Sequence, residues 1–441
     1  MSDTDPMLQI ERSIQESNGL LTADYSQYEL FSLFQPIFSF AHKRLVGCEG
    51  LTRCVDANGR LIPPGRLFGS VRNIGQTIFL DRLMRALHVG NYNTRKRDNS
   101  WLFLNVSPVV VINGDRQKPF FSELLKKYDF PPHRVVIEVM ETSIPDEDSL
   151  ESMVSHYQEL GCMVAIDDFG AGHSNFERIW RLKPDIVKLD RIMIQRAAMD
   201  PTIQRSLSMI VALVHEIGGL VLAEGIETEK QAIMAINADV DLVQGFLFSE
   251  SFNPMANQPD CSELFDRLHD RMIQQNIDEE GDFRRAVQAY VEEFIRTANM
   301  LAAGLNIYTA TQEMAQMDRV MRFYLLNQSG SQIGENISSQ HRNNQRDLRL
   351  APLFDTQGAN WAHRPYFRRA MARPDEVQLT RPYLSLTDAR MCITLTRVVK
   401  LKRERAVLCC DLEWRPHTDD QDLTTTADIQ KLFGSNSAPP L

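Results

Sequence analysis

The chain has 441 residues, a length that predicts two or three domains, and its hydrophobic (43%) and charged (24%) fractions are those of a globular protein with a sizeable core. Its net charge of −10 argues against a general binder of nucleic-acid polymers or anionic membranes, because such a protein needs a basic face. A small phosphate ligand remains compatible with this charge, since bound metal ions can supply the missing positive charge.

The sequence shows no sign of export or of membrane insertion. Residues 1–20 are polar and lack the apolar segment of a secretory signal, and no run of about 18 apolar residues predicts a membrane span. The seven cysteines have no CxxC spacing, which favours reduced and buried thiols. We therefore expect a cytoplasmic protein.

Apolar, strand-like runs alternate with amphipathic helical stretches between about residues 30 and 248. The predicted strands cover 31–40, 45–54, 101–106, 134–140, 162–169, 185–190, 219–225 and 242–248, and the predicted helices include 76–92, 146–160 and 201–217. This alternation predicts an α/β fold with a mostly parallel sheet. About eight strands in roughly 230 residues favour a TIM-type (β/α)8 barrel over an open doubly wound sheet. No GxGxxG motif follows the first strand, which disfavours a dinucleotide-binding fold.

A different composition begins near residue 259. Residues 282–301 place their apolar side chains on one helical face, and residues 321–330, 390–400 and 405–414 predict antiparallel strands. We expect an N-terminal tail over 1–25, the barrel over 26–258, linker helices over 259–304, a smaller α+β domain over 305–415 and a flexible tail over 416–441.

Polar side chains stand where the predicted barrel strands end. They are Glu49, Asn105, Glu138, Asp167, Asp168, Lys188, Glu224 and Gln244. Catalytic groups of a TIM-type barrel project from the carboxyl ends of its strands, so we expect these side chains to converge on one mouth. Carboxylates this close together cannot all be ionised without cations, and oxygen ligands without His or Cys favour Mg²⁺ or Mn²⁺ over zinc. Two such ions about 4 Å apart would support in-line attack on a phosphodiester.

Each of these residues also has an ordinary structural explanation. A single carboxylate after a strand is usually a helix cap or a surface charge, Lys188 suits a strand-end ion pair, and Arg53 suits either the surface or a phosphate. Gly170 and Gly172 predict a tight turn beside the aspartates, where a gating loop would also be useful. Successive strands that each end in a metal-type ligand are hard to obtain from capping alone. The pattern therefore favours a metal site.

Residues 30–254 resemble the EAL domain, the family of cyclic-di-GMP-specific phosphodiesterases. The motifs that carry the resemblance are FQPIFSF (34–40), CEGLTR (48–53), LNVSP (104–108), IEVMETS (137–143), IDDFGAGHSNF (166–176), PDIVKLD (184–190), LAEGIE (222–227) and VQGFLFS (243–249). The resemblance implies a barrel with an antiparallel first strand, two Mg²⁺ or Mn²⁺ ions, and hydrolysis of cyclic di-GMP to linear pGpG by a water that both ions activate. It also implies a homodimer that pairs through helices near the DDFGAG loop.

The resemblance further assigns roles to individual residues. The residues that would hold the metal ions are Glu49, Asn105, Glu138, Asp167 and Asp168. Those that would act in catalysis are Lys188, which positions the attacking water, Glu224 and Gln244 beside it, and Glu141, which holds the loop after DDFG. Those that would contact the substrate are Gln35, Leu51, Arg53 and Asp190. The departures are Gly50 for the alanine of Glu-Ala-Leu, and His173 and Phe176 for a tyrosine and a leucine of the loop; the acidic ligands stay intact.

Residues 305–415 resemble, over shorter motifs, the PAS-like sensor domains of the Cache type. The supporting segments are 325–337, 361–371, 381–385 and 392–399. Arg364, Tyr366, Arg381 and Tyr383 are candidates to line a pocket for a small anion, although such side chains more often pack or lie at a rim. We expect an unknown small ligand here that regulates the barrel through the helix at 282–301.

Two alternatives to an active hydrolase stay open. The barrel would in one case bind cyclic di-GMP and signal to a partner without hydrolysing it. In the other it would be a scaffold for the second domain, which leaves the mouth carboxylates unexplained. Because a pure receptor has no need of Lys188 and both aspartates, the complete set of polar residues favours the hydrolase.

Overall fold

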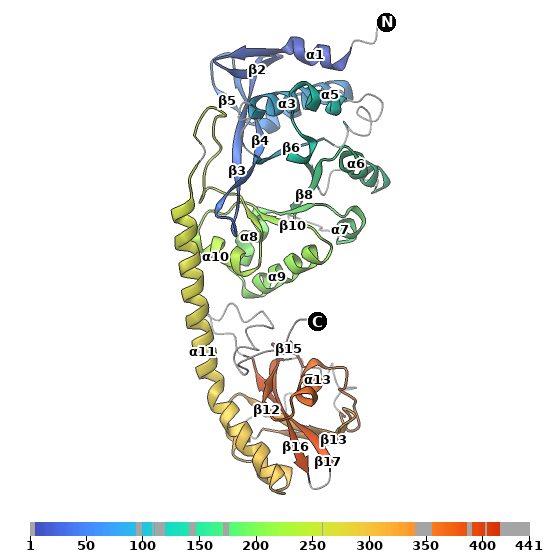
Figure 1. Ribbon diagram of the computed structural model, residues 1–441, viewed down its shortest axis with the longest axis vertical. Coiled ribbons are helices and arrows are strands. Elements are labelled where there is room, and N and C mark those ends of the chain that lie inside the picture. The colour runs from blue at the N-terminus through green and yellow to red at the C-terminus, as the bar shows by residue number, and fades with distance from the viewer. Residues whose placement is uncertain are drawn as a thin grey trace. The chain divides into compact units, whose positions relative to one another are not determined.

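Eight strands close into a barrel in the computed structural model, counted over the residues that the structure describes, namely 5–93, 99–107, 110, 120–140, 147–170, 176–257, 259–339, 355–385, 390–401 and 404–414 (Figure 1). The barrel lies in the first of two compact units, residues 1–273. Its strands are β3 (Tyr28–Ser39), β4 (Arg44–Asp56), β6 (Trp101–Asn105), β7 (Val135–Met140), β8 (Met163–Phe169), β9 (Ile186–Leu189), β10 (Leu220–Ala223) and β11 (Leu242–Val243).

The first barrel strand runs against its neighbours. β3 pairs antiparallel with β4 and with β11, whereas every other neighbouring pair in the barrel is parallel. The connection from β3 to β4 is a tight turn, which can join only antiparallel strands. The predicted TIM-type barrel with an antiparallel first strand is confirmed. The short strand β5 (Leu61–Ile62) extends the sheet beyond β4.

Helices between the strands have sequence signals that fix their first turns. Asp190 caps α8 (Arg191–Ala197), Asp200 caps α9 (Pro201–Glu216) ahead of a proline, and Thr228 forms a capping box with Gln231 at the start of α10 (Glu229–Asn237). The remaining helices of this unit are α2 (Pro64–Gly69), α3 (Ile74–Asn93), α5 (Phe120–Lys127), η2 (Pro132–Arg134), α6 (Glu147–Glu159) and α7 (Phe176–Leu182).

The segment before the barrel is structured, which corrects the expected N-terminal tail over 1–25. From residue 5 onward it forms α1 (Pro6–Ser13), β1 (Ile14–Ser17) and β2 (Leu20–Tyr25), and β2 pairs antiparallel with β3. Met7 and Ile10 are buried, and the Asn91 side chain binds both the backbone N–H and the carbonyl of Leu21. The polar composition of this segment did not predict a packed helix, because only two of its apolar side chains, three residues apart, are buried in the core.

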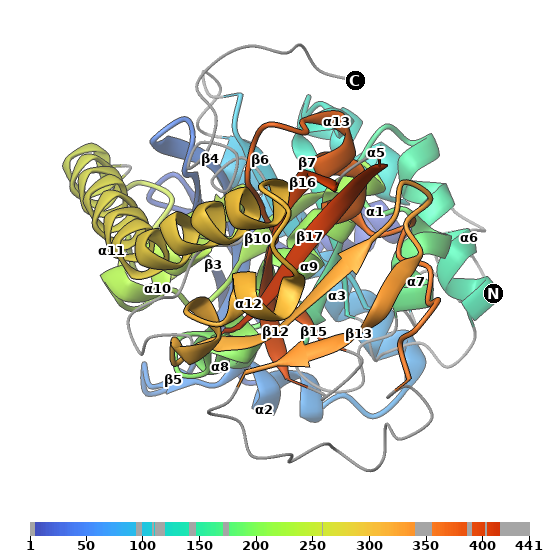
Figure 2. The same ribbon diagram turned by 90° about the horizontal axis from the view of Figure 1, so that it is seen from below.

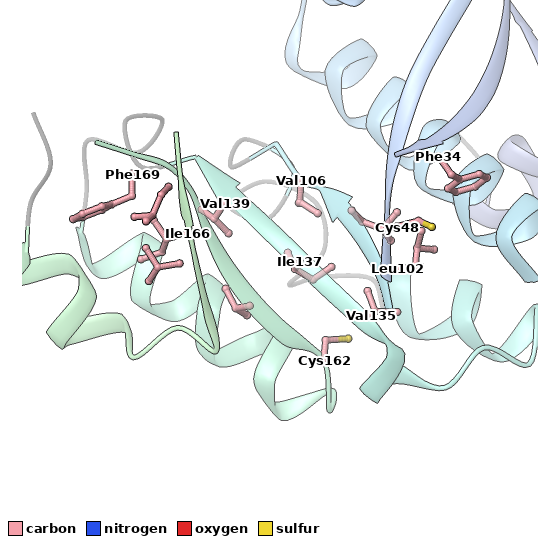
Figure 3. Packing of buried hydrophobic residues seen from close by; sticks show 14 of the residues in the cluster. Phe34, Cys48, Leu102, Val106, Val135, Ile137, Val139, Cys162, Ile166 and Phe169 are labelled. Carbon is pink, nitrogen blue, oxygen red and sulfur yellow. The ribbon is translucent and has the colours of Figure 1, made fainter. Parts of the chain in front are cut away.

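The barrel wall separates two apolar layers because side chains alternate along each strand. Val135, Ile137 and Val139 of β7 belong to the core between the strands and the helices (Figure 3). The intervening Val136 belongs to the barrel interior, whose apolar layer consists of Ile37, Phe103, Val136, Ala165, Ile186, Leu222 and Leu242. This interior layer is packed, so the barrel is no open channel at this depth.

The second unit, residues 274–441, is built on an antiparallel sheet in the order β13-β12-β17-β16-β14, and β15 also pairs with β16. Figure 2 shows β12, β17 and β16 side by side. The elements are α12 (Ile307–Thr311), η3 (Met314–Gln316), β12 (Val320–Leu326), β13 (Gln332–Ser338), α13 (Pro365–Ala372), β14 (Gln378–Leu379), β15 (Tyr383–Leu384), β16 (Met391–Leu401) and β17 (Glu404–Glu413). The predicted smaller α+β region is confirmed. The expected tail over 416–441 lies outside the described residues.

One helix, α11 (Ser262–Ala302), takes the place of the predicted linker helices. Phe265 and Leu268 near its start belong to the core of the first unit, and Val287 and Phe294 belong to the core of the second. Across the part of the chain that the structure describes, no helix combines the length and the apolar composition needed to cross a membrane.

Candidate active site

Nearly every barrel strand carries a polar side chain two positions beyond an interior residue, toward its carboxyl end. The pairs are Gly47 and Glu49, Phe103 and Asn105, Val136 and Glu138, Ala165 and Asp167, Ile186 and Lys188, Leu222 and Glu224, and Leu242 and Gln244. Residues two apart on a strand face the same side, so these polar groups rise from the apolar interior layer into the mouth. On β3, which runs the other way, Gln35 precedes Ile37 and reaches the same end.

Lys188 lies at the centre of this mouth. Its ammonium nitrogen is 2.5 Å from Glu138 Oε1, 2.6 Å from Glu224 Oε1, 3.0 Å from Asp167 Oδ1 and 3.9 Å from Glu49 Oε2, and its side chain is 1% exposed. Burial by itself lowers the pKa of Lys188, but the surrounding carboxylates raise it well above the usual value. The lysine is therefore charged and holds four carboxylates together.

Two amides orient Glu49. Asn105 Nδ2 donates to Oε1 over 2.9 Å, and Gln244 Nε2 donates to Oε2 over the same distance. These two donors come from β6 and from the residue after β11, strands far apart in the sequence. Both carboxylate oxygens are thereby fixed in direction.

A bulge in β8 lets two consecutive aspartates face the same region. The register between β8 and β9 shifts between Ile166 and Phe169, and Asp168 has φ +59° with its backbone N–H bonded to Asp167 Oδ1 at 3.0 Å. In a regular strand these two side chains would point to opposite faces. Here one oxygen each of Asp167, Asp168 and Glu224 lies within 4.8 Å of the others.

The electrostatics of the mouth fit divalent cations. Five carboxylates face one lysine, and burial raises the pKa of Glu138 well above its usual value, that of Glu224 to about 7, and that of Asp168 upward. Within the described residues, Glu138 Oε2 and Gln244 Oε1 are buried without a hydrogen-bond partner. The mouth thus has more negatively charged oxygen groups than positive charges, and two of its buried oxygen atoms have no hydrogen-bond partner. Such oxygen atoms are the ligands that a hard metal ion prefers.

A cavity opens beside these groups. Its lining includes the predicted Gln35, Glu49, Glu224 and Gln244, and it adds residues that sequence reasoning missed, namely Arg191, Gly225, Glu227, Gly245 and Phe246. Arg191 directly follows the strand residues IVKL and Asp190, and Phe246 stands in the QGF motif with 65% of its surface exposed. The signal available in the sequence was the QGF motif itself.

Other predicted residues do not line this cavity. Arg53 donates from Nη1 to the Thr52 carbonyl, Asp190 caps α8 by accepting from the Ile192 N–H, and Leu51 is half-buried. Their predicted contacts with the substrate stay predictions. Glu141 and the loop residues 171–175 lie outside the described residues.

The fold and the site define a TIM-type barrel protein whose mouth is built to hold divalent cations. The chain matches the EAL domain over residues 18–251, and it belongs to that family. The family resemblance inferred from the motifs is thereby confirmed.

Several relatives are similar over this region. The chain is 28% identical over 243 residues to the cyclic di-GMP phosphodiesterase RocR of Pseudomonas aeruginosa (53% of this chain, 59% of RocR) and 26% identical over 226 residues to the cyclic di-GMP phosphodiesterase PdeL of Escherichia coli (50% and 62%). It thus spans less than two thirds of the length of either protein.

A further relative is similar over both units. The uncharacterized EAL-domain containing protein YkuI of Bacillus subtilis is 25% identical over 366 residues, 78% of this chain and 84% of YkuI. The crystal structure of the B. subtilis YkuI protein in complex with c-di-GMP and calcium superposes with a TM-score of 0.74 at 20% identity, covering 87% of this chain and 96% of that one. The latter comparison supports the fold.

Proposed function

We propose that the barrel hydrolyses cyclic di-GMP to linear pGpG with two Mg²⁺ or Mn²⁺ ions. The observation that carries the proposal is the mouth itself, where Lys188 gathers four carboxylates beside an open cavity. The names of RocR and PdeL, both cyclic di-GMP phosphodiesterases, support the choice of substrate.

The proposed metal ligands divide between two sites. The residues for the first ion are Glu49, Asn105, Glu138 and Asp167, and those for the second are Asp168 with Glu224 close to it. When bound, such ions would activate a water and offset the charge that develops on the phosphodiester. The hydrogen bonds from Asn105 and Gln244 keep the Glu49 carboxylate in a single orientation.

The rest of the proposed chemistry belongs to the chain's own side chains. Lys188, fully charged, positions the attacking water and stabilises negative charge on the phosphoryl oxygens. Arg191 brings a second positive charge to the cavity, and the exposed ring of Phe246 offers a stacking surface for a guanine base. Arg191 is proposed because the dinucleotide carries negatively charged phosphodiesters, and Phe246 is proposed because it carries planar purine bases.

The test is turnover of cyclic di-GMP by the purified chain with Mg²⁺ or Mn²⁺, followed by the appearance of pGpG. Glu49→Gln keeps the size of the side chain but removes its charge, and we expect it to lower turnover by about 10²-fold or more. Glu216→Gln, exposed at the end of α9, is the matched control and should leave turnover unchanged. Tight binding of cyclic di-GMP without turnover under either metal would instead favour the receptor.

We propose in addition that the chain is a cytoplasmic homodimer. Trp180 of α7, directly after the 171–175 loop, is 54% exposed, as a side chain in a subunit contact would be in the free chain, and light scattering would measure the mass. All seven cysteines are buried thiols that form no disulfide, which suits a reducing compartment, and cell fractionation would test the location.

We propose finally that the second unit is a PAS-like sensor that regulates the barrel. The support is α11, which contributes apolar side chains to the core of each unit within one continuous helix. A ligand that changes the packing at one end of such a helix has a covalent and hydrogen-bonded path to the other.

A further inference from the structure

Three charged side chains are buried in the middle of α3, and none of them belongs to the proposed site. Asp81 and Arg82 are each 7% exposed, Arg85 is 1% exposed, and all residues from Leu80 to Tyr92 are buried. Charges are costly to remove from water, and a buried ion pair contributes little to stability compared with apolar side chains of the same size. The presence of these charges in α3 therefore needs an explanation other than packing.

Arg85 is held by contacts from three helices. Its Nε lies 2.7 Å from Asp81 Oδ2, one turn earlier in α3, and its Nη1 donates to the hydroxyl of Tyr157 in α6 over 3.2 Å. Its guanidinium also lies over the ring of Phe121 in α5, 5.3 Å from the centroid. Because these contacts fix the guanidinium, Arg85 both neutralises the Asp81 carboxylate and determines its orientation.

The second oxygen of Asp81 binds the segment that follows β6. Asp81 Oδ1 accepts from the backbone N–H of Ser107 over 2.9 Å, and Ser107 lies two residues after Asn105, the last residue of β6. The intervening Val106 donates its backbone N–H to the carbonyl of Glu138 in β7 over 3.2 Å. Two successive peptide groups after Asn105 are thus hydrogen-bonded, one to β7 and the other to α3.

The orientation of Asn105 depends on these two backbone contacts. Asn105 is exposed at the end of its strand, so little packing fixes its side chain, yet its Nδ2 donates to Glu49 Oε1 over 2.9 Å. A backbone shift of about 1 Å would be enough to break such a hydrogen bond. The bond from Ser107 to Asp81 is therefore in a position to control the contact between Asn105 and Glu49.

We propose that Asp81, neutralised by Arg85, is a positioning residue of the mouth. By holding Ser107 it keeps Asn105 against Glu49, so that both present their oxygen atoms to the first proposed metal ion. The inference rests on the proposed function for the identity of the bound group, whereas the series of contacts from Arg85 to Glu49 does not depend on it. The Ser107 N–H needs an acceptor rather than a charge, and variants can separate these two properties.

Two double variants make this separation. Asp81→Leu/Arg85→Met replaces the ion pair by apolar side chains of similar size and removes the acceptor of the Ser107 N–H. Asp81→Asn/Arg85→Gln removes the same charges, but the asparagine carbonyl can still accept from Ser107, and its amide can donate to the glutamine carbonyl. Asp185→Leu is the matched control, because Asp185 Oδ2 accepts from the Val164 N–H over 2.8 Å near the start of β8, at the end of that strand opposite to the mouth.

The electron paramagnetic resonance signal of free Mn²⁺ measures metal binding by the purified full chain without substrate. We expect Asp81→Leu/Arg85→Met to weaken Mn²⁺ binding about tenfold and to lower the turnover of cyclic di-GMP by at least as much. Asp81→Asn/Arg85→Gln and Asp185→Leu should bind Mn²⁺ like the native chain. Thermal unfolding ranks the variants by stability, and a purely structural role of Asp81 would make the loss of Mn²⁺ affinity follow that ranking.

If Asp81→Leu/Arg85→Met fails to fold, Asp81→Ala/Arg85→Gln replaces it, because this variant also removes the acceptor but keeps a polar side chain beside Tyr157. Native Mn²⁺ affinity in the variant without the acceptor overturns the proposal, as does an equal loss in the asparagine variant or in Asp185→Leu. A native chain that binds Mn²⁺ without hydrolysing cyclic di-GMP contradicts the proposed function alone, and the Mn²⁺ affinities still decide the role of Asp81. A native chain that binds no Mn²⁺ contradicts both.

Discussion

Glu138 is the least exposed carboxylate of the mouth, and its Oε2 is one of the buried atoms without a partner. Holding a charge there costs free energy when no metal ion is bound, because burial and then Glu49 raise the pKa of this group by more than the neighbouring Lys188 lowers it. We therefore expect Glu138→Gln to raise the free energy of unfolding by on the order of 1 kcal/mol in EDTA.

The same substitution should act in the opposite direction once metal is added. Removing a proposed ligand should weaken the stabilisation that Mn²⁺ gives by tenfold or more in apparent Kd, measured by thermal unfolding across MnCl₂ concentrations. Glu216→Gln serves again as the control. A Glu138→Gln protein that is less stable in EDTA yet gains the native stabilisation from Mn²⁺ would contradict the assignment.

His88 explains the glycine that replaces the alanine of the Glu-Ala-Leu motif. A Cβ on Gly50 would lie 2.9 Å from His88 Cγ, so the imidazole fills the space that the alanine methyl would occupy. The ring is buried, with Nδ1 2.9 Å from Ser32 Oγ. Burial, and then Arg53, lower the pKa of His88 to about 3, so this histidine is neutral at pH 7.

The lowered pKa of His88 predicts that the free energy of unfolding decreases in acid. The unfolded chain takes up a proton at His88 near pH 6.5, whereas the folded chain does so only near pH 3. Stability is therefore complete above pH 6.5 and is lost as the pH falls toward 3; at pH 5 the loss from this group is about 2 kcal/mol. Urea denaturation between pH 7.5 and about 5 should show this slope. In His88→Gln the slope should be shallower by that amount, and an unchanged slope would contradict the prediction.

At the scale of the elements, the turn after β11 sets the position of Gln244. Ile226 and the segment from Gln244 to Leu247 are joined by backbone hydrogen bonds, Ile226 N–H to the Gln244 carbonyl and Leu247 N–H to the Ile226 carbonyl. Gly245 lies between these bonds, and a Cβ there would meet backbone atoms of Ile226 far inside contact distance. Glycine is required at this position for steric reasons alone.

Gly245→Ala should therefore be costly. We expect it to lower the free energy of unfolding by about 3 kcal/mol and to reduce turnover, because the backbone beside Gln244 must move. Gly218→Ala is a matched control: Gly218 has φ +86° with nothing within 4 Å of a Cβ, so only backbone strain of about 1 kcal/mol is expected. Equal urea midpoints for the two variants would show that the close approach has no energetic consequence.

At the scale of the whole molecule, α11 is the element shared by both units, and residues 273–278 of this helix are exposed. Gln275→Pro breaks the helix there at a cost of about 3 kcal/mol, without touching either core. If the second unit regulates the barrel, this variant should change the turnover of cyclic di-GMP while Gln275→Ala should not. Calorimetry would confirm that both units still unfold cooperatively. Native turnover in the proline variant would contradict regulation through the helix.

The sequence by itself determined the features that depend on near neighbours in the chain. Alternation with a period of two placed Val136 and Glu138 on the inner face of one strand, and the same interval recurs on the other strands. Most of the barrel strands and the set of polar residues at the mouth could therefore be predicted from the alternation, whereas the antiparallel first strand was implied only by the resemblance to the EAL family.

Only the tertiary structure decided what depends on contacts between distant segments. The bulge that turns Asp168 toward Asp167 interrupts the regular alternation, and the helix over residues 6–13 is held by two apolar side chains in a polar stretch. Arg191 and Phe246 reach the cavity from different elements. Periodicity reports which face a residue lies on, whereas the partner it meets there is chosen by the packing of the whole chain.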